Sequence, residues 1–305
     1  MIIVKLMGGL GNQMFQYAFG LMLVNKFEQQ VCLDISWFNY HTNRKLNLKE
    51  FKPILKFRKR DVFFIILGNI LIWLSEHFRF IRMLRPVFHL RNIEEYICSI
   101  EQKFIYTKIQ GRNFNLDMLK NNKNYYLEGY WQNPEYFEGI RKTILKNFSF
   151  PKLKNFEDSR LQNKISDSES IAIHIRRGDY IKNPTINQFH GTCSLEYYKK
   201  AAELIASKVT NAKFFLFTDD PNFVKDNFGF LPNTTLVSDS NRSDIDELNL
   251  MHSCKHFIIA NSTFSWWGAW LSQHPEKIVV APKQWFKNVE TNKKCKIIPK
   301  DWTRI

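Results

Sequence analysis

The chain has 305 residues, of which 44% are hydrophobic and 15% aromatic, enough to bury the cores of two domains of ordinary size. Its net charge of +15 favours an acidic partner, and candidates are nucleic acid, an anionic membrane face and a phosphorylated small molecule. Its five cysteines are widely spaced without a CxxC pair, which argues against a zinc site and a disulfide framework.

The chain opens with an apolar segment, residues 1–6, that predicts a strand, followed by a glycine-rich turn and an apolar helix over residues 14–27. Lys5 interrupts the apolar segment, so it does not resemble a signal peptide, and we expect a cytoplasmic protein. Asn12 and Gln13 lie in the turn, where their amides either bind a sugar or a diphosphate, or cap the following helix.

The next predicted strand, residues 31–35, carries Asp34, roughly where dinucleotide-binding folds keep a ribose-binding acid. In the preceding turn, however, Met14 stands where such folds need a third glycine. This departure argues against a nicotinamide or flavin site.

Residues 50–120 are basic and aromatic and contain the most apolar stretch, residues 62–74. That stretch is shorter than the roughly 18 residues of a membrane span, so it predicts a buried helix, with a membrane-surface contact as the alternative. A strand over residues 125–130 then leads into an aromatic segment, residues 131–137, which forms either a sugar platform or core.

Phe148 to Asn155 contains Pro151 and several polar residues, which indicates a crossing between domains at residues 1–150 and 151–305. Beyond it, strands at 171–175, 213–217, 256–260 and 278–281 alternate with helices near 195–209 and 243–254. This alternation predicts an α/β fold with a parallel sheet. The turns after these strands therefore share one carboxyl edge, where such sheets bind ligands.

The first of these turns contains the sequence HIRRGDY, from His174 to Tyr180. Because side chains alternate along a strand, His174 and Arg176 are expected to point the same way. Arginine suits a phosphate because its planar fork matches two oxygens, and Asp179 is close enough to orient it. The alternative is an ordinary surface arginine pair.

Two further turns carry polar groups. After residues 213–217, Pro221 makes Asp220 the expected helix cap, which leaves Asp219 free to face a ligand. After residues 256–260, Asn261, Ser262 and Thr263 begin a helix and form either a phosphate cradle or an ordinary cap.

Five segments together resemble the bacterial alpha-1,2-fucosyltransferases of glycosyltransferase family 11: GGLGNQMFQYA, GYWQNPEYF, HIRRGDY, HGTCSLEYY and NSTFSWWGAWL. The resemblance extends from Gly8 to beyond Trp285, with no matching motif at about residues 50–120. It implies a GT-B-like fold of two Rossmann-type domains facing each other across a cleft. The N-terminal domain would bind the acceptor and the C-terminal domain GDP-fucose.

The resemblance implies an inverting transfer of L-fucose from GDP-fucose to the 2-hydroxyl of a terminal beta-galactoside. It places Arg176 on the donor diphosphate, His174 on the nucleotide and Asp219 on guanine. Asn261, Ser262 and Thr263 would hold phosphate, and Asn12 would reach the diphosphate or fucose from the opposite domain. A related transferase that uses another nucleotide sugar is the alternative.

The chemistry needs positive charge at the leaving diphosphate, which Arg176 and the residues near Ser262 can supply, so no metal and no cofactor is expected. Asp219 and Asp220 are adjacent, unlike the spaced acids of a DxD metal site. The general base is open among Asp179, Glu128, Glu135, Asp34 and His190, or none is needed.

No nucleic-acid partner is expected, because the arginine-rich blocks are short and scattered. The basic charge is consistent with peripheral contact with the inner membrane. The sequence gives no indication of oligomeric state.

Overall fold

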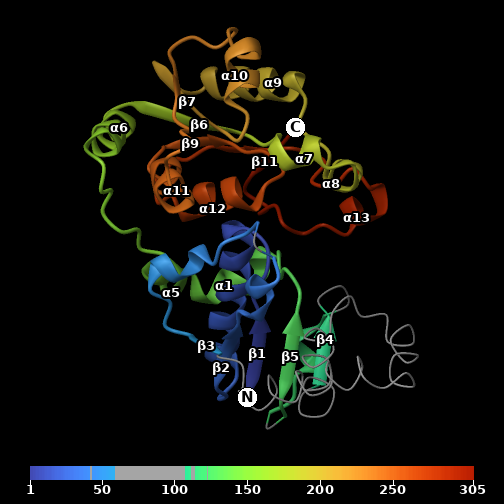
Figure 1. Cartoon of the computed structure of the whole chain (residues 1–305). Coiled ribbons are helices and arrows are strands. Elements are labelled where there is room, and N and C mark those ends of the chain that lie inside the picture. The colour runs from blue at the N-terminus through green and yellow to red at the C-terminus, as the bar shows by residue number, and fades with distance from the viewer. Residues whose placement is uncertain (42, 59–106, 111–113, 122) are drawn as a thin grey trace, which may run out of the picture. The chain divides into compact units, whose positions relative to one another are not determined.

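The computed structural model describes residues 1–41, 43–58, 107–110, 114–121 and 123–305 (Figure 1). The apolar stretch at residues 62–74, with its alternative membrane-surface contact, lies outside this part of the chain. Within the described residues, no helix has the length and apolar character needed to cross a bilayer.

The chain forms two compact units whose bounds differ from a division at residue 150. The first contains residues 1–9, 15–46 and 53–131, and the second contains residues 10–14, 47–52 and 132–305. Residues 132–150 and the short segment at 10–14 therefore group with the C-terminal part of the chain.

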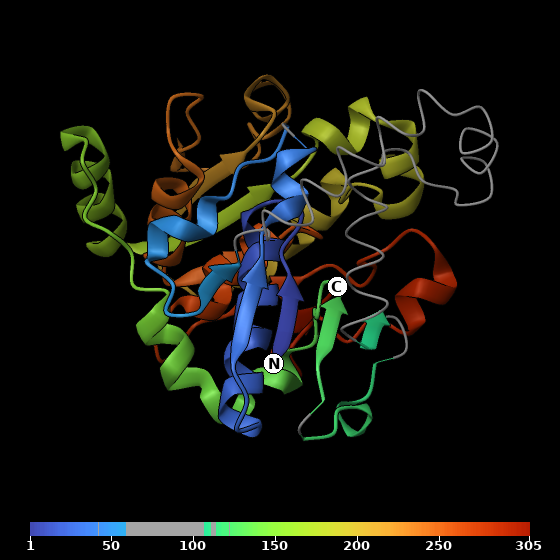
Figure 2. The same ribbon diagram turned by 60° about the horizontal axis from the view of Figure 1, so that its bottom comes forward.

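The first unit is built on a five-stranded parallel sheet, with strand arrows that run the same way in both views (Figures 1 and 2). Its order is β3 (Lys56–Arg58), β2 (Val31–Asp34), β1 (Ile2–Lys5), β5 (Tyr125–Glu128) and β4 (Thr107–Gln110). Ile2, Ile3 and Val4 are fully buried, as an apolar strand at the centre of a parallel sheet requires.

Helix α1 (Leu10–Lys26) begins earlier than the sequence indicates, so the glycine-rich segment contributes its first turn to the helix. Gln13 and Gln16 are fully buried there. The Gln13 side chain accepts a hydrogen bond from the Leu48 amide, at the short helix η2 (Asn47–Phe51). Gln13 thus has a structural role and does not lie at an exposed loop tip.

The second unit contains a six-stranded sheet in the order β11 (Thr303–Arg304), β10 (Val279–Ala281), β9 (His256–Ile258), β6 (Glu169–Ile175), β7 (Ala212–Thr218) and β8 (Thr234–Leu236). Read from β8 to β11, this is the 3-2-1-4-5-6 order of a Rossmann sheet. The chain leaves β6 in one direction and returns at β9 on its other side, which creates a switch point at the carboxyl ends of these two strands.

Helices cover both faces of the second sheet, as doubly wound folds require (Figure 1). One core cluster joins Ile171, Ile173 and Ile175 of β6 to helices α9 (Leu195–Ala206) and α10 (Pro221–Asn227). Helices α11 (Asp244–His252) and α12 (Thr263–Leu271) lie on the other side of the sheet. The predicted alternation along β6 is confirmed, because Ala172 and His174 are not part of the isoleucine cluster.

The remaining helices of the described chain are shorter or lie at the edges of the second unit. They are η6 (Pro134–Ile140), α5 (Arg141–Asn147), α6 (Phe156–Ser166), α7 (Gly178–Lys182), α8 (Pro184–His190) and α13 (Val289–Lys293). In the first unit, η1 (Ser36–Asn39) and η5 (Leu116–Met118) follow strands β2 and β4.

Candidate active site

The HIRRGDY turn leaves the carboxyl end of β6 and is fixed by an ion pair. Nη1 of Arg176 lies 2.9 Å from Oδ2 of Asp219, which follows the last residue of β7. The other Asp219 oxygen accepts hydrogen bonds from the backbone amides of Arg177, at 2.8 Å, and Gly178, at 2.9 Å. We call this arrangement of Arg176, Asp219 and the two amides the arginine clamp.

The clamp keeps Asp219 ionised. Burial acts to raise the pKa of Asp219, but the Arg176 guanidinium and the two amides outweigh it, so the pKa lies below its usual value. A Cβ atom on Gly178 would lie 2.8 Å from Oδ2 of Asp219, so only glycine allows this close approach. Asp219 was expected to be free to face a ligand; both of its oxygens are bound within the chain, and a direct contact with a ligand stays a prediction.

Asp219 also takes the orienting role that the sequence suggested for Asp179. The side chain of Asp179 lies outside the described part of the chain, and its backbone belongs to α7. Its assignment as a catalytic residue stays a prediction.

The second arginine of the pair, Arg177, packs against the start of α10. Nε of Arg177 lies 3.3 Å from Oδ2 of Asp220, and its guanidinium carbon lies 3.5 Å from the centre of the Phe223 ring. Asp220 caps α10 by accepting from the Phe223 amide at 3.2 Å, with Pro221 at the first helical position, as the sequence predicts. Arg177 thus packs against α10, whereas Arg176 is held by Asp219.

His174 lies two residues before Arg176, on the face of β6 opposite the three isoleucines, and is 5% exposed. Among the described residues, its Nδ1 has no hydrogen-bond partner. Burial lowers the pKa of His174 to about 3, Asp219 opposes the shift and Arg176 adds to it, so the imidazole is neutral. A buried polar atom without a partner costs about 1–3 kcal/mol, which a ligand that bonds to it would recover.

The turn after β9 places its three polar residues differently. Nδ2 of Asn261 donates to the carbonyls of His190, Gly191 and Trp285, at 2.9, 3.3 and 3.2 Å. This side chain therefore joins the turn after β9 to two other segments of the chain. Ser262 is the N-cap of α12 but makes no side-chain capping bond, and the first turn of α12 contains no acid. The N-terminal amides of α12 therefore favour an anion.

The first turn of α1, which belongs to this same unit, meets the start of α12. Oδ1 of Asn12 accepts from Oγ1 of Thr263 at 3.1 Å and from Nε2 of Gln132 at 3.0 Å. Nε1 of Trp267 donates to the Gly11 carbonyl at 3.0 Å, and a Cβ atom on Gly11 would lie 2.5 Å from the Thr263 backbone. Asn12 was expected to reach the diphosphate or fucose from the opposite domain. It groups with the second unit and contacts Thr263 of α12, and its role toward the donor stays a prediction.

The two helix starts are electrostatically alike. Neither α1 nor α12 has an acid in its first turn or a side-chain cap. Two positive helix ends in contact repel each other slightly, and an anion bound to both would relieve this repulsion.

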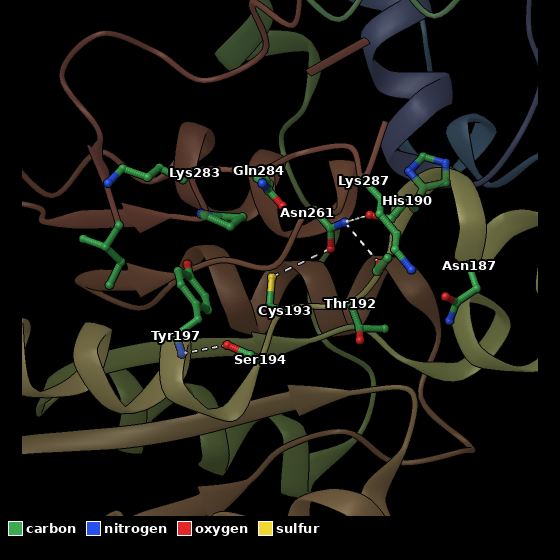
Figure 3. A pocket seen from close by; sticks show the side chains of 13 residues that line it. Asn187, His190, Thr192, Cys193, Ser194, Tyr197, Asn261, Lys283, Gln284 and Lys287 are labelled. Carbon is green, nitrogen blue, oxygen red and sulfur yellow. Dashed lines mark hydrogen bonds between the residues drawn. The ribbon is translucent and has the colours of Figure 1, made fainter. Parts of the chain in front are cut away.

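A pocket of about 440 Å³ lies beside the Asn261 turn (Figure 3). Its polar lining side chains come from α8, from the loop before α9 and from the loop after β10, and include Asn187, His190, Thr192, Ser194, Lys283 and Lys287. Among the described residues that line it, none is an aspartate or glutamate. The lining is therefore suited to polar, neutral or anionic groups.

Tyr180 connects the pocket to the clamp. Its ring stacks on His190 at 4.9 Å and lies 5.5 Å from the guanidinium carbon of Arg176, and its hydroxyl donates to the Asn261 carbonyl at 3.2 Å. No local pattern marks Tyr180 as part of the site, apart from its place at the end of the HIRRGDY turn.

Comparison with known proteins gives the family. A family model described as glycosyl transferase family 11 matches residues 1–305. The chain belongs to glycosyl transferase family 11. The predicted family is thereby confirmed, and with it the broad enzyme class, a glycosyltransferase. The two Rossmann-type sheets agree with the GT-B-like fold class that the resemblance implied.

Two relatives from Escherichia coli match this glycosyltransferase over nearly their whole length. The chain is 32% identical to "O-antigen biosynthesis glycosyltransferase WbnK", covering 98% of this chain and 99% of the relative. It is 30% identical to "Alpha-1,2-colitosyltransferase", covering 100% and 98%. Among solved structures it is similar to NodZ, an alpha-1,6-fucosyltransferase soaked with GDP-fucose, at 12% identity and a TM-score of 0.49, covering 92% of this chain and 94% of that one.

The structure narrows the candidates for the general base of the family 11 enzyme. Asp34 accepts hydrogen bonds from the Tyr126 hydroxyl at 2.6 Å and from Ser36, so it stabilises the first sheet. Glu128 forms an ion pair with Lys5 at 2.8 Å. These contacts give both acids a structural function, while Asp179, Glu135 and His190 stay open.

Within the described residues, no group of three or more His, Cys, Asp or Glu side chains is arranged to hold a metal ion. Metal independence stays a prediction, which the chelator experiment below addresses.

Proposed function

We propose that this glycosyltransferase transfers L-fucose from GDP-fucose to the 2-hydroxyl of a terminal beta-galactoside, with inversion, in surface glycan synthesis. The observation that carries the proposal is the arginine clamp at the switch point of the second sheet, beside the first turn of α12. An arginine fixed by an ionised carboxylate, next to helix amides without a first-turn acid, suits a diphosphate.

In the proposed mechanism, the bond between fucose C1 and the phosphate oxygen breaks, and negative charge grows on the departing GDP. Arg176 and the amides of Ser262 and Thr263 stabilise this charge, because they are already oriented before the reaction begins. The acceptor 2-hydroxyl attacks C1 from the opposite face and gives its proton to a general base, for which Asp179, Glu135 and His190 are the candidates, or to water.

His174 would contact the nucleotide through its unpartnered Nδ1. Because its pKa is lowered to about 3, the neutral ring can accept or donate a hydrogen bond without adding charge at neutral pH. The pocket behind Tyr180 and His190 would receive sugar hydroxyls, for which Asn187, Thr192 and Ser194 provide partners. Asp219, which the resemblance placed on guanine, would instead act on the donor through Arg176.

A second candidate is transfer of another sugar, and one finding favours it: a relative at 30% identity is named an alpha-1,2-colitosyltransferase. Incubation of the purified enzyme with lactose and a panel of donors separates the candidates. The panel contains GDP-fucose, GDP-mannose, nucleotide-activated colitose and UDP-sugars.

We expect a fucosylated product from GDP-fucose, with the alpha-1,2 linkage identified by NMR. Product only from nucleotide-activated colitose would support the second candidate. Product only from GDP-mannose or a UDP-sugar would contradict both.

For location, we propose a cytoplasmic enzyme in peripheral contact with the inner membrane, on the basis of the net charge of +15. Cell fractionation should recover it from the cytoplasm and from the salt wash of the membranes. A periplasmic pool would contradict this location.

A further inference from the structure

A short hydrogen-bonded chain leads from α11 to the arginine clamp. Oγ of Ser238 lies 2.5 Å from Oε1 of Glu247, and the backbone amide of Thr218 lies 2.6 Å from the same Ser238 oxygen. Because a serine hydroxyl has a single proton, Ser238 donates it to Glu247 and accepts from Thr218 with a lone pair. Glu247 therefore fixes the orientation in which Ser238 can receive the Thr218 amide.

Thr218 is the last residue of β7, and the next residue is Asp219. Any displacement of Thr218 moves the carboxylate that holds Arg176 and the amides of Arg177 and Gly178. The position of the guanidinium thus depends on a carboxylate that belongs to another element of the fold.

We propose that Glu247 is a positioning residue: through Ser238 it holds the end of β7, and with it Asp219 and Arg176, where the donor diphosphate binds. The inference rests on the proposed function, in which the diphosphate lies against Arg176. It adds a residue outside the segments that the resemblance matched.

The alternative is that Glu247 only stabilises α11 through the helix dipole. It lies in the first turn of α11 together with Asp244 and Asp246, and acids are favoured there. Two observations separate Glu247 from them. Its oxygen accepts from Ser238, which binds the end of β7, whereas Asp244 accepts from Asn47 and Asp246 from Ser243. Glu247 is also placed where burial disfavours its charge.

Burial raises the pKa of Glu247 from 4.5 to about 7; Ser238 and Arg242 oppose the shift, and Asp244 and Asp219 add to it. An acid with a raised pKa contributes stability that is present below its unfolded pKa and is lost as pH rises through 7. At pH 8 the enzyme thus keeps a carboxylate that lowers its stability, as positioning would explain and dipole stabilisation would not.

The experiment uses the full chain and four variants: Glu247→Gln, Glu247→Leu, Ser238→Ala and, as the matched control, Asp244→Asn. Asp244 lies in the same helical turn with the same charge, and its exposed side chain accepts from Asn47 rather than from Ser238. The measurements are the affinity for GDP by calorimetry, the KM values for donor and acceptor, and the melting temperature.

We expect Glu247→Leu and Ser238→Ala each to weaken GDP binding about ten-fold with an unchanged acceptor KM, because each removes a hydrogen bond that positions the clamp. The double variant should be no weaker than either single variant, since both act through one chain of contacts. Asp244→Asn should leave GDP affinity unchanged.

Glu247→Gln keeps the acceptor oxygen and removes the charge. We expect it to bind GDP about five-fold more weakly than wild type at pH 8 and equally at pH 6, where wild type is itself protonated. Because variant and wild type are compared at the same pH, the protonation of GDP itself affects both affinities equally. At pH 8, Glu247→Gln should also melt at a higher temperature than wild type, so that stability rises while donor binding falls.

Equal losses in Glu247→Leu and Asp244→Asn would overturn the proposal in favour of the helix dipole. Tighter GDP binding by Glu247→Gln at pH 8 would also overturn it, because repulsion of the diphosphate would then dominate. If Glu247→Leu does not fold, the Gln and Ser238→Ala variants still decide. Unchanged GDP binding by Arg176→Ala would instead contradict the proposed donor site, which distinguishes the two failures.

Discussion

Oδ2 of Asp219 lies 2.9 Å from Nη1 of Arg176, so the first residue after β7 holds the arginine that follows β6. The two residues directly follow the neighbouring strands β6 and β7, whose registered pairs end at Ile175 and Thr218. A parallel sheet thereby brings to one edge two groups that lie far apart in sequence. The guanidinium is oriented before any substrate arrives, and preorganised charge of this kind makes arginine effective at a leaving group.

Arg176→Lys should lower kcat/KM for the donor by roughly 100-fold, although the charge is kept. A lysine ammonium cannot bind the Asp219 carboxylate and present a planar fork to the diphosphate at the same time. Steady-state kinetics measures the loss, and circular dichroism checks that the variant is folded. The matched control is Arg160→Lys, an exposed residue paired with Glu157, which should retain full activity. Retained turnover in Arg176→Lys would contradict a central role for the fork.

Asp219→Asn should make the free energy of unfolding less dependent on pH in the acid range. The pKa of Asp219 is lowered in the folded enzyme, so its contribution to stability is present above its unfolded value of 3.8 and is lost as pH falls through the folded value. Urea unfolding of wild type and variant between neutral pH and pH 3 gives the difference. Parallel curves for the two proteins would show that Asp219 has no special interaction with Arg176.

Local sequence rules predicted much of the second unit. Asp220 caps the helix expected of it, because a cap depends on residues only two or three positions away. The alternation along β6 was also predictable, since the strand period depends only on the backbone.

Other features of the site depend on contacts between distant residues, which no local pattern contains. Asp219 lies 41 residues from the Gly178 amide that it binds. The residues next to Asp219 in the sequence therefore could not show that its carboxylate is hydrogen-bonded. Asn261 bonds to carbonyls 24 to 71 residues away, and its structural role was hidden for the same reason. Gly11 looked like part of a turn because glycine disfavours helices, yet the approach of Thr263 requires it within the first turn of α1.

Chelation should leave turnover unchanged. In the proposed mechanism Arg176 and the helix amides carry the charge of the leaving diphosphate, and the carboxylates of Asp219 and Asp220 are already bound to arginines and amides. The assay compares rates without added metal, with EDTA, and with EDTA followed by excess magnesium. A rate that falls with EDTA and returns with magnesium would place a metal ion in the reaction and contradict the expected independence.

Gly11→Ala should destabilise the second unit and impair donor binding. The new Cβ atom would lie 2.5 to 2.7 Å from the backbone and hydroxyl of Thr263 and the amide of Phe264, so the starts of α1 and α12 must move apart. Overpacking of this kind costs about 1–3 kcal/mol, and the movement would also disturb the Asn12–Thr263 hydrogen bond. Gly139→Ala is the matched control, because nothing lies within 4 Å of a Cβ atom built there. Chemical unfolding and GDP titration should show losses in Gly11→Ala and none in Gly139→Ala. Equal behaviour of the two variants would mean that the close contact between the helix starts does not support the site.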